Sequence, residues 1–245
     1  MLRTPPYKII TPDYRDGLFC DIFPHYDTGL TMLDRSGNGN DMVIDGCTLE
    51  KDSSVGNKQV ISFDGADDFA TIAHSADFLL DEFTIIMLVK KPLTNMLDSE
   101  QVFIKNSLVD VGDEISRSTF EFYLDSSERV RFKTWGDTLE EDNVDISSYH
   151  TIGDSGYYLL AWELDSVSCR AYSNGLLVKT DSSDNTNILF SADYDLIFSI
   201  DPLDFNSPYS GSIALFRIYN KALGMENLTK INKHIYAKFG MLPLI

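Results

Sequence analysis

The chain has 245 residues, of which 43% are hydrophobic and 12% aromatic, and its formal net charge at pH 7 is −18. This hydrophobic content excludes intrinsic disorder, and no apolar stretch approaches the length needed to cross a bilayer. The negative charge repels nucleic acid phosphates and anionic lipid headgroups, so we expect neither nucleic acid nor membrane partners.

The acidic residues indicate a β-rich chain. Among 38 acidic residues Asp outnumbers Glu, and Asp favours turns because its side chain bonds to its own backbone. Residues 1–16 contain three prolines, which cannot donate to a sheet, so an extended arm is predicted that becomes regular near Gly17.

Short strands follow in close succession. The run at 83–91 is apolar on both faces, which predicts a strand covered on both sides. Further strands are predicted at 102–105, 119–124, 157–163, 169–172, 176–179, 195–200 and 210–219. Leu228, Ile231, Ile235 and Phe239 then recur at helical spacing up to Gly240, a C-cap residue.

Two hairpins can be placed in register. A three-residue loop at 126–128 sets Phe122 opposite Phe132 and Glu121 opposite Lys133, whereas a four-residue loop loses every such pair. Asn174-Gly175 predicts a two-residue type I′ turn between 169–172 and 176–179. The sequence therefore predicts an all-β, two-sheet antiparallel jelly-roll sandwich with one C-terminal helix. Its expected parts are an arm at 1–16, the sandwich at 17–223, and a helix with an apolar tail at 224–245.

Two clusters of Asp, Asn and Gly offer oxygen ligands for a divalent cation. DRSGNGND spans 34–41 and SFDGADDF spans 62–69. Carboxylates and amides in turns suit calcium, so the candidate ligands are Asp34, Asn38, Asp64, Asp67 and Asp68. Turn formation explains the same residues, with Gly37 and Gly39 at positive φ, and both interpretations stay open.

Cysteine and histidine carry no recognisable site pattern. Cys20, Cys47 and Cys169 are widely spaced, which predicts buried free thiols. The four histidines are far apart in sequence, and no metal spacing or nucleophile signature accompanies them. The first residues lack the apolar core of a secretion signal, so folding is expected in a reducing cytoplasm.

Five motifs in order resemble the laminin G-like, concanavalin A-like jelly-roll domains. They are DRSGNGND, SFDGADDFATI, FTIIMLVK, AYSNGLLV and GSIALFRIYNKAL, and a helix follows the last. The resemblance covers Gly17 to Phe239. RIYNKAL and AKFG near the end are similar to versions on bacteriophage virion proteins. The resemblance implies a domain that binds glycans or proteins, or builds a surface.

Glucanases with the concanavalin-like fold carry alternating acids on one strand, which raises the possibility of an enzyme. The nearest stretch places Glu121 and Asp125 four residues apart, or roughly 13 Å on a strand, whereas retaining glycosidases need about 5–5.5 Å. Glu163 and Asp165 are better spaced, but ion pairing or solvation is expected for them. We therefore predict no catalytic residues and no enzyme.

Aromatic and basic side chains on the first hairpin offer a sugar platform. Tyr123, Arg131 and Trp135 share one face, and they are glycan-binding candidates if that face is concave. If it is convex, they form a solvated or partner-covered surface. Trp162 is expected in the core, on one face with Tyr158 and Leu160.

These observations predict a non-enzymatic structural or adhesion module of a phage virion, such as a head fibre, tail or capsid decoration protein. The arm at 1–16 and the apolar tail at 241–245 are expected to contact other virion subunits, and a homo-oligomer is possible in this reading. The expected location is the host cytoplasm during folding and then the virion surface. The alternatives are a stand-alone carbohydrate-binding module and a divergent polysaccharide-active enzyme.

Overall fold

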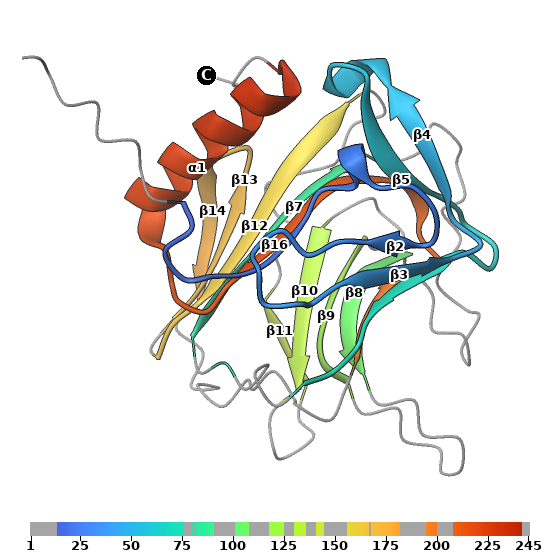
Figure 1. Ribbon diagram of the computed structural model, residues 1–245. Coiled ribbons are helices and arrows are strands. Elements are labelled where there is room, and N and C mark those ends of the chain that lie inside the picture. The colour runs from blue at the N-terminus through green and yellow to red at the C-terminus, as the bar shows by residue number, and fades with distance from the viewer. Residues whose placement is uncertain are drawn as a thin grey trace, which may run out of the picture.

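The computed structural model describes residues 14–75, 80, 82–90, 101–107, 118–124, 130–135, 141–144, 156–166, 168–181, 195–199 and 208–241. In this part of the chain two antiparallel sheets face each other, and helix α1 (Gly224–Phe239) covers the outer face of one of them (Figure 1). The predicted all-β jelly-roll sandwich with one C-terminal helix is therefore confirmed. No helix in these ranges is long and apolar enough to span a membrane.

The helix-covered sheet has eight strands. In spatial order they are β14 (Leu176–Asp181), β13 (Cys169–Ser173), β12 (Tyr157–Leu164), β7 (Phe83–Lys90), β16 (Ser210–Tyr219), β5 (Lys58–Asp64) and β4 (Thr48–Asp52). The eighth strand, β1 (Leu18–Ile22), pairs with the C-terminal half of β16. Two short 3-10 helices, η1 (Pro24–Tyr26) and η2 (Ser53–Val55), flank the sheet.

The second sheet also has eight strands. Their order is β11 (Glu141–Val144), β10 (Val130–Trp135), β9 (Ser118–Leu124), β8 (Gln101–Ser107), β15 (Asp195–Ser199), β6 (Phe69–Ile72), β3 (Met42–Asp45) and β2 (Thr31–Met32). Strands β2, β3 and β11 are short segments that the sequence did not single out, because too few apolar residues alternate in them to give a periodic signal.

The core has two layers, and β7 belongs to both. Ile85, Met87 and Val89 point into the space between the sheets, while Ile86 and Leu88 pack under α1. This arrangement confirms the expectation that the strand is covered on both faces. Trp162 is fully buried in the inter-sheet core, as predicted, because β12 lies next to β7.

Helix α1 follows the predicted apolar periodicity. Leu228, Ile231, Ile235 and Phe239 are buried against the sheet, and Gly240 ends the helix with a left-handed φ of 65°. Each N-terminal turn of a helix leaves backbone N–H groups without a partner, and Leu223 at the N-cap supplies no side-chain acceptor.

Both predicted hairpin registers are confirmed. Phe122 pairs with Phe132 and Glu121 with Lys133, although the loop itself lies outside the described residues. Ser173 pairs with Leu176, which leaves Asn174 and Gly175 as a two-residue turn whose φ angles, 50° and 85°, are both positive.

The chain enters the fold differently from the expected extended arm. Residues 14–17 form a turn in which the N–H of Leu18 donates to the carbonyl of Arg15 at 2.9 Å. The proline pattern did not predict this turn, because residues distant in sequence also hold it: the N–H of Asn220 donates to the carbonyl of Gly17 at 2.8 Å. Most of the predicted arm, 1–13, and most of the apolar tail, 242–245, lie outside the described residues.

Candidate functional site

Asp34 organises the first Asp-Asn-Gly cluster as a turn. Its Oδ1 accepts from the N–H groups of Asp21 and Ser36, both at 2.9 Å, and its Oδ2 accepts from Ser36 Oγ and from the N–H of Asn40. The Asn38 carboxamide donates to the carbonyl of Phe19 at 2.9 Å. Four hydrogen bonds occupy this carboxylate, so it stabilises the connection between β1 and β3.

The second cluster brings three carboxylates together. Asp64, Asp67 and Asp68 each offer an oxygen, and these oxygens lie within 4.8 Å of one another. Asp68 is 6% exposed, and burial together with the charges of Asp64 and Asp67 raises its pKa. The Oδ2 of Asp68 accepts from the N–H of Asp64 at 2.7 Å, and Gly65 adopts a φ of 79°. The second cluster is thus also a turn held by hydrogen bonds.

The structure does not join the two clusters. Asp34 binds the backbone of Asp21, which pairs with Arg217, whereas Asp64 pairs with Ser210 on the same strand β16. Seven residues along a strand correspond to about 23 Å. A single site therefore cannot use all five candidate ligands, and calcium stays a prediction for Asp64, Asp67 and Asp68 alone.

The predicted sugar platform is only partly accessible. Tyr123 pairs with Arg131 as expected, but Tyr123 is 2% exposed and does not present its ring to solvent. Arg131 is partly buried, and the backbone of Trp135 pairs with Glu141. The glycan-binding role of these residues remains a prediction.

The better-spaced acids are engaged in ion pairs. The guanidinium of Arg170 binds both Glu163 and Asp165, and the side chain of Glu163 is fully buried. The second carboxylate oxygen of Glu163 accepts from the N–H of Gly224, which supplies the missing acceptor at the start of α1. Ion pairing was the expected role. Of the other acids considered, Asp125 lies outside the described residues.

The cysteines and histidines are dispersed as predicted within the described ranges. Cys20, Cys47 and Cys169 are free and buried, and burial raises the pKa of Cys47 to about 12. His74 contacts Asp195 at the surface, and the His234 ring stacks on Tyr14 with centroids 4.2 Å apart.

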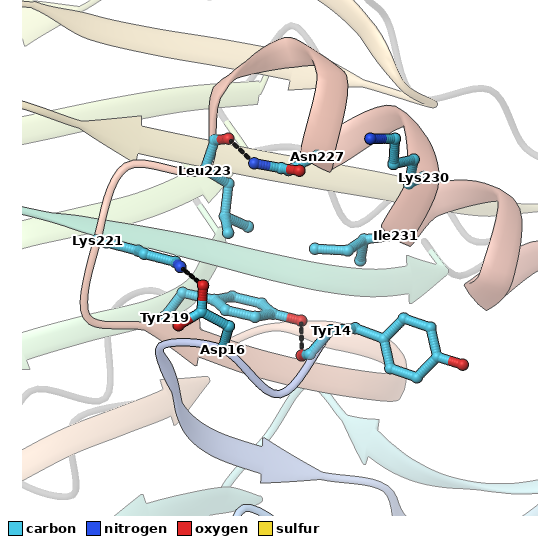
Figure 2. A pocket seen from close by; sticks show the side chains of 8 residues that line it. All are labelled: Tyr14, Asp16, Tyr219, Lys221, Leu223, Asn227, Lys230 and Ile231. Carbon is cyan, nitrogen blue, oxygen red and sulfur yellow. Dashed lines mark hydrogen bonds and ion pairs between the residues drawn. The ribbon is translucent and has the colours of Figure 1, made fainter. Parts of the chain in front are cut away.

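A pocket lies where the entry turn, the end of β16 and the first half of α1 meet (Figure 2). Its volume is about 210 Å³, and it is lined by Tyr14, Asp16, Tyr219, Lys221, Leu223, Asn227, Lys230 and Ile231. Lys221 and Asp16 form an ion pair at one side, and Asn227 and Lys230 extend from α1 at the other. We call it the entry-turn pocket.

The walls of the entry-turn pocket are held by backbone and buried side-chain contacts. The hydroxyl of Tyr219 donates to the carbonyl of Tyr14 at 3.2 Å, and burial raises the pKa of Tyr219, so the hydroxyl stays protonated. Thr84 fixes the connection into α1, because its Oγ donates to the Lys221 carbonyl and accepts from the N–H of Leu223. Gly17 has a φ of 76°, a backbone conformation that residues with a side chain rarely adopt, which explains the glycine at this position.

The lining combines donors, acceptors and apolar surface. Lys230 offers an ammonium that also pairs with Glu226, Asp16 offers a carboxylate that also pairs with Lys221, and Asn227 uses one amide hydrogen on the Leu223 carbonyl, which leaves its oxygen as an acceptor. Drug-sized ligands need roughly 300–1,000 Å³, whereas a cavity of about 150 Å³ takes a benzene ring. The entry-turn pocket therefore suits one substituted ring or one side chain. Sequence reasoning missed it because Asp16 and Lys221 are 205 residues apart.

The family comparison agrees with the fold. Residues 64–229 match the model of the concanavalin A-like lectin/glucanases superfamily. No curated protein sequence matches the chain.

Solved structures with a similar fold include toxin binding domains. The binding domain of Paraclostridial Mosquitocidal Protein 1 superposes with a TM-score of 0.73 at 13% identity, over 93% of this chain and 56% of that one. The botulinum neurotoxin serotype D ligand binding domain in complex with N-acetylneuraminic acid gives 0.69 at 13% identity, over 90% and 51%. The binding domain of botulinum neurotoxin DC in complex with rat synaptotagmin II gives 0.66 at 13%, over 90% and 52%. The chain thus spans little more than half of each.

Proposed function

This chain belongs to the concanavalin A-like lectin/glucanases superfamily, which contains both binding proteins and enzymes, and we infer that this member is a non-enzymatic binding module. The observation that carries the proposal is the entry-turn pocket, which combines apolar walls with charged and amide groups in a volume of about 210 Å³. Such a pocket holds one ring or side chain of a larger partner.

The acids considered for catalysis make structural contacts, which supports a binding role over catalysis. A glycosidase needs one carboxyl group to protonate the leaving oxygen and a second to act as nucleophile or base. Glu163 is held by Arg170 and by the N–H of Gly224, so both of its carboxylate oxygens accept hydrogen bonds within the fold. In the entry-turn pocket the lining contains one carboxylate, that of Asp16.

A sugar fits the entry-turn pocket better than an apolar peptide side chain. A sugar hydroxyl donates and accepts at once, which matches Lys230, Asn227 and Asp16, while the ring carbons match Leu223 and Ile231. The similar toxin domains support a binding role in general, because their names describe binding to N-acetylneuraminic acid or to synaptotagmin. Their low identity leaves the ligand of this chain to be found by experiment.

Glycan screening tests the proposal. We expect reproducible hits on a glycan array, and loss of those hits in Lys230→Ala and Asn227→Ala. Lys233→Ala is the matched control, because Lys233 is exposed on the same helix but does not line the pocket. Hits that survive both pocket variants would place the ligand elsewhere, and release of reducing sugar from a polysaccharide would overturn the non-enzymatic assignment.

We propose a virion context on the resemblance of RIYNKAL and AKFG to phage proteins. In this proposal the chain is a head fibre, tail or decoration protein that folds in the host cytoplasm, and 1–16 and 241–245 contact neighbouring subunits. Mass spectrometry of purified particles tests it, and truncation of either segment should abolish incorporation. The stand-alone carbohydrate-binding module is favoured instead if the chain is missing from particles but binds glycans.

A further inference from the structure

Four lysines lack a carboxylate partner in a strongly acidic protein, and three of them gather near η1. Across the described ranges Lys51, Lys58, Lys233 and Lys238 form no ion pair, although the net charge is −18. Three other lysines do pair with acids, namely Lys90, Lys221 and Lys230. Lys233 is exposed on α1, whereas the charges of Lys51, Lys58 and Lys238 all act on His25 in η1.

Lys58 on β5 and Lys51 on the neighbouring strand β4 lie near His25, which contacts β5. The N–H of Gln59 donates to Nδ1 of His25 at 3.2 Å. Lys58 immediately precedes Gln59, and Lys51 lies opposite Gln59 in the β4–β5 ladder. Since Nδ1 accepts a hydrogen bond, a neutral His25 carries its proton on Nε2, which can donate to a ligand.

Lys238 approaches the surroundings of His25 from helix α1. Its Nζ lies 3.6 Å from the ring centroid of Phe23, which is 5.6 Å from the His25 ring. The end of α1 and the β4–β5 hairpin lie at the same end of the molecule, and a side chain on Gly56 would meet the Phe239 carbonyl (Figure 1). Three separate elements therefore bring cations to η1.

Tyr26 adds an exposed aromatic ring beside these cations. It is 68% exposed, and its centroid lies 4.6 Å from that of His25. The Arg35 guanidinium lies 5.3 Å from the Tyr26 centroid and is itself neutralised by Asp27, at 2.7 Å. Arg35, His25 and Phe23 thus hold the Tyr26 ring in place, while 68% of the residue remains exposed to solvent. We call the five residues His25, Tyr26, Lys51, Lys58 and Lys238 the aromatic–cation patch.

The charges in this patch repel one another. Burial lowers the pKa of His25, and the charges of Lys58, Lys51 and Lys238 lower it further. Burial, together with Arg217, Arg35 and Lys58, lowers the pKa of Lys238 to about 8, although Asp21 opposes this shift. An anion placed here would relieve the repulsion.

We propose that the aromatic–cation patch binds a sugar that carries a carboxylate. The pyranose ring stacks on Tyr26, and its carboxylate is held by the ammonium groups of Lys51, Lys58 and Lys238. An acidic sugar would use both the exposed ring and the unpaired cations of the patch. A neutral sugar would not need the cations, and a simple anion would not need the ring. A long polyanion is disfavoured, because the rest of the protein would repel it.

This site is separate from the entry-turn pocket. Lys238 follows Lys230 by eight residues on α1, which corresponds to about 12 Å along the helix axis. The proposal goes beyond the proposed function and does not depend on it. Variants at the two sites can therefore be scored independently.

Titration with small sugars followed by NMR tests the patch. We expect glucuronic acid or N-acetylneuraminic acid to shift resonances of Tyr26 and Lys238, and glucose to leave them unchanged. Lys58→Ala should weaken binding by about tenfold, and Tyr26→Ala by about five- to tenfold, with Tyr26→Phe restoring it. Raising the salt from about 0.1 M to about 1 M should weaken binding, because the Debye length falls from about 10 Å to 3 Å.

The controls separate this proposal from the pocket. Lys233→Ala should bind as the parent protein does. If Lys230→Ala abolishes binding and the patch variants do not, the acidic sugar belongs to the pocket and the patch proposal fails. Equal binding of glucose and glucuronic acid, or of acetate with the same lysine dependence, would also overturn the assignment to an acidic sugar.

Discussion

Asp21 and Arg217, which are 196 residues apart in the sequence, form a buried ion pair in which Nε of Arg217 donates to Oδ1 of Asp21 at 2.8 Å. The pair joins β1 to β16, the first strand to the last. It lies beneath α1, and Nη1 of Arg217 is buried without a hydrogen-bond partner in the described part of the chain.

Removing one member of this pair should be more damaging than removing both. Asp21→Ala leaves the Arg217 charge buried and should lower the free energy of unfolding by about 3–5 kcal/mol. Asp21→Leu combined with Arg217→Met should lie much closer to the parent protein, because no uncompensated charge remains. Urea denaturation measures both. Equal losses in the two variants would show that packing at these positions, rather than charge, sets the stability.

Glu163 is predicted to act as the cap of α1. Glu163→Ala removes the acceptor for the N–H of Gly224 and one of the two carboxylate partners of Arg170, which keeps Asp165, and should cost about 1–3 kcal/mol. Glu163→Gln keeps an acceptor and should cost less. Hydrogen exchange at Gly224 reports the cap directly, since exchange should accelerate in the Ala variant. A polysaccharide-degrading activity lost in Glu163→Gln would instead reveal a catalytic role.

Gly175 should tolerate no side chain, for two reasons that a control can separate. Its φ is 85°, and an added Cβ would lie 2.9 Å from Nδ2 of Asn232. Gly175→Ala should therefore cost more than the roughly 1–2 kcal/mol of a left-handed non-glycine residue. Gly37→Ala is the matched control, because Gly37 has a φ of 95° and nothing within 4 Å. Thermal unfolding compares them, and equal costs would exclude the contact with Asn232.

The calcium prediction now has a defined location. If Asp64, Asp67 and Asp68 bind the ion, calcium should raise the melting temperature and a chelator should reverse the rise. Asp67→Asn should remove the shift, whereas Asp34→Asn should lower the melting temperature with and without calcium. A melting temperature in the parent protein that does not depend on calcium would rule out a calcium site at these residues.

Lys238 should make stability depend on pH in the alkaline range. Its folded-state pKa of about 8 lies below the ordinary value of 10.5, so the unfolded chain binds more protons between these values. The free energy of unfolding should therefore rise as the pH increases from about 8 to 10.5. The contribution of Lys238 to stability should be least favourable below pH 8. Lys238→Met should flatten the rise and stabilise the protein at pH 7 by roughly 1–3 kcal/mol. An unchanged pH profile in this variant would contradict the assignment.

Local patterns were sufficient to predict the layers and the hairpins. Register between Phe122 and Phe132 followed from alternation, and the Asn174-Gly175 turn followed from the need for positive φ. The family resemblance gave the same sandwich. These features depend on residues close together in the sequence, where periodicity of two or 3.6 residues carries the information.

The candidate sites depended on contacts that no local pattern contains. The entry-turn pocket unites Asp16 with Lys221, and the aromatic–cation patch unites His25 with Lys238. In contrast, the conspicuous acids of the first cluster proved to be turn-forming residues, because Asp34 uses its oxygens on backbone N–H groups. Tyr123 was placed on the correct strand position but is buried.

The position of β16 has a consequence for how the protein is made. This strand lies between β7 and β5 and also pairs with β1, yet it ends at Tyr219. During synthesis the earlier strands β7, β5 and β1 must wait, with one edge unpaired, until residues 210–219 have left the ribosome. The sandwich should therefore form late relative to the synthesis of its first strands, and nascent chains should need a chaperone until β16 arrives.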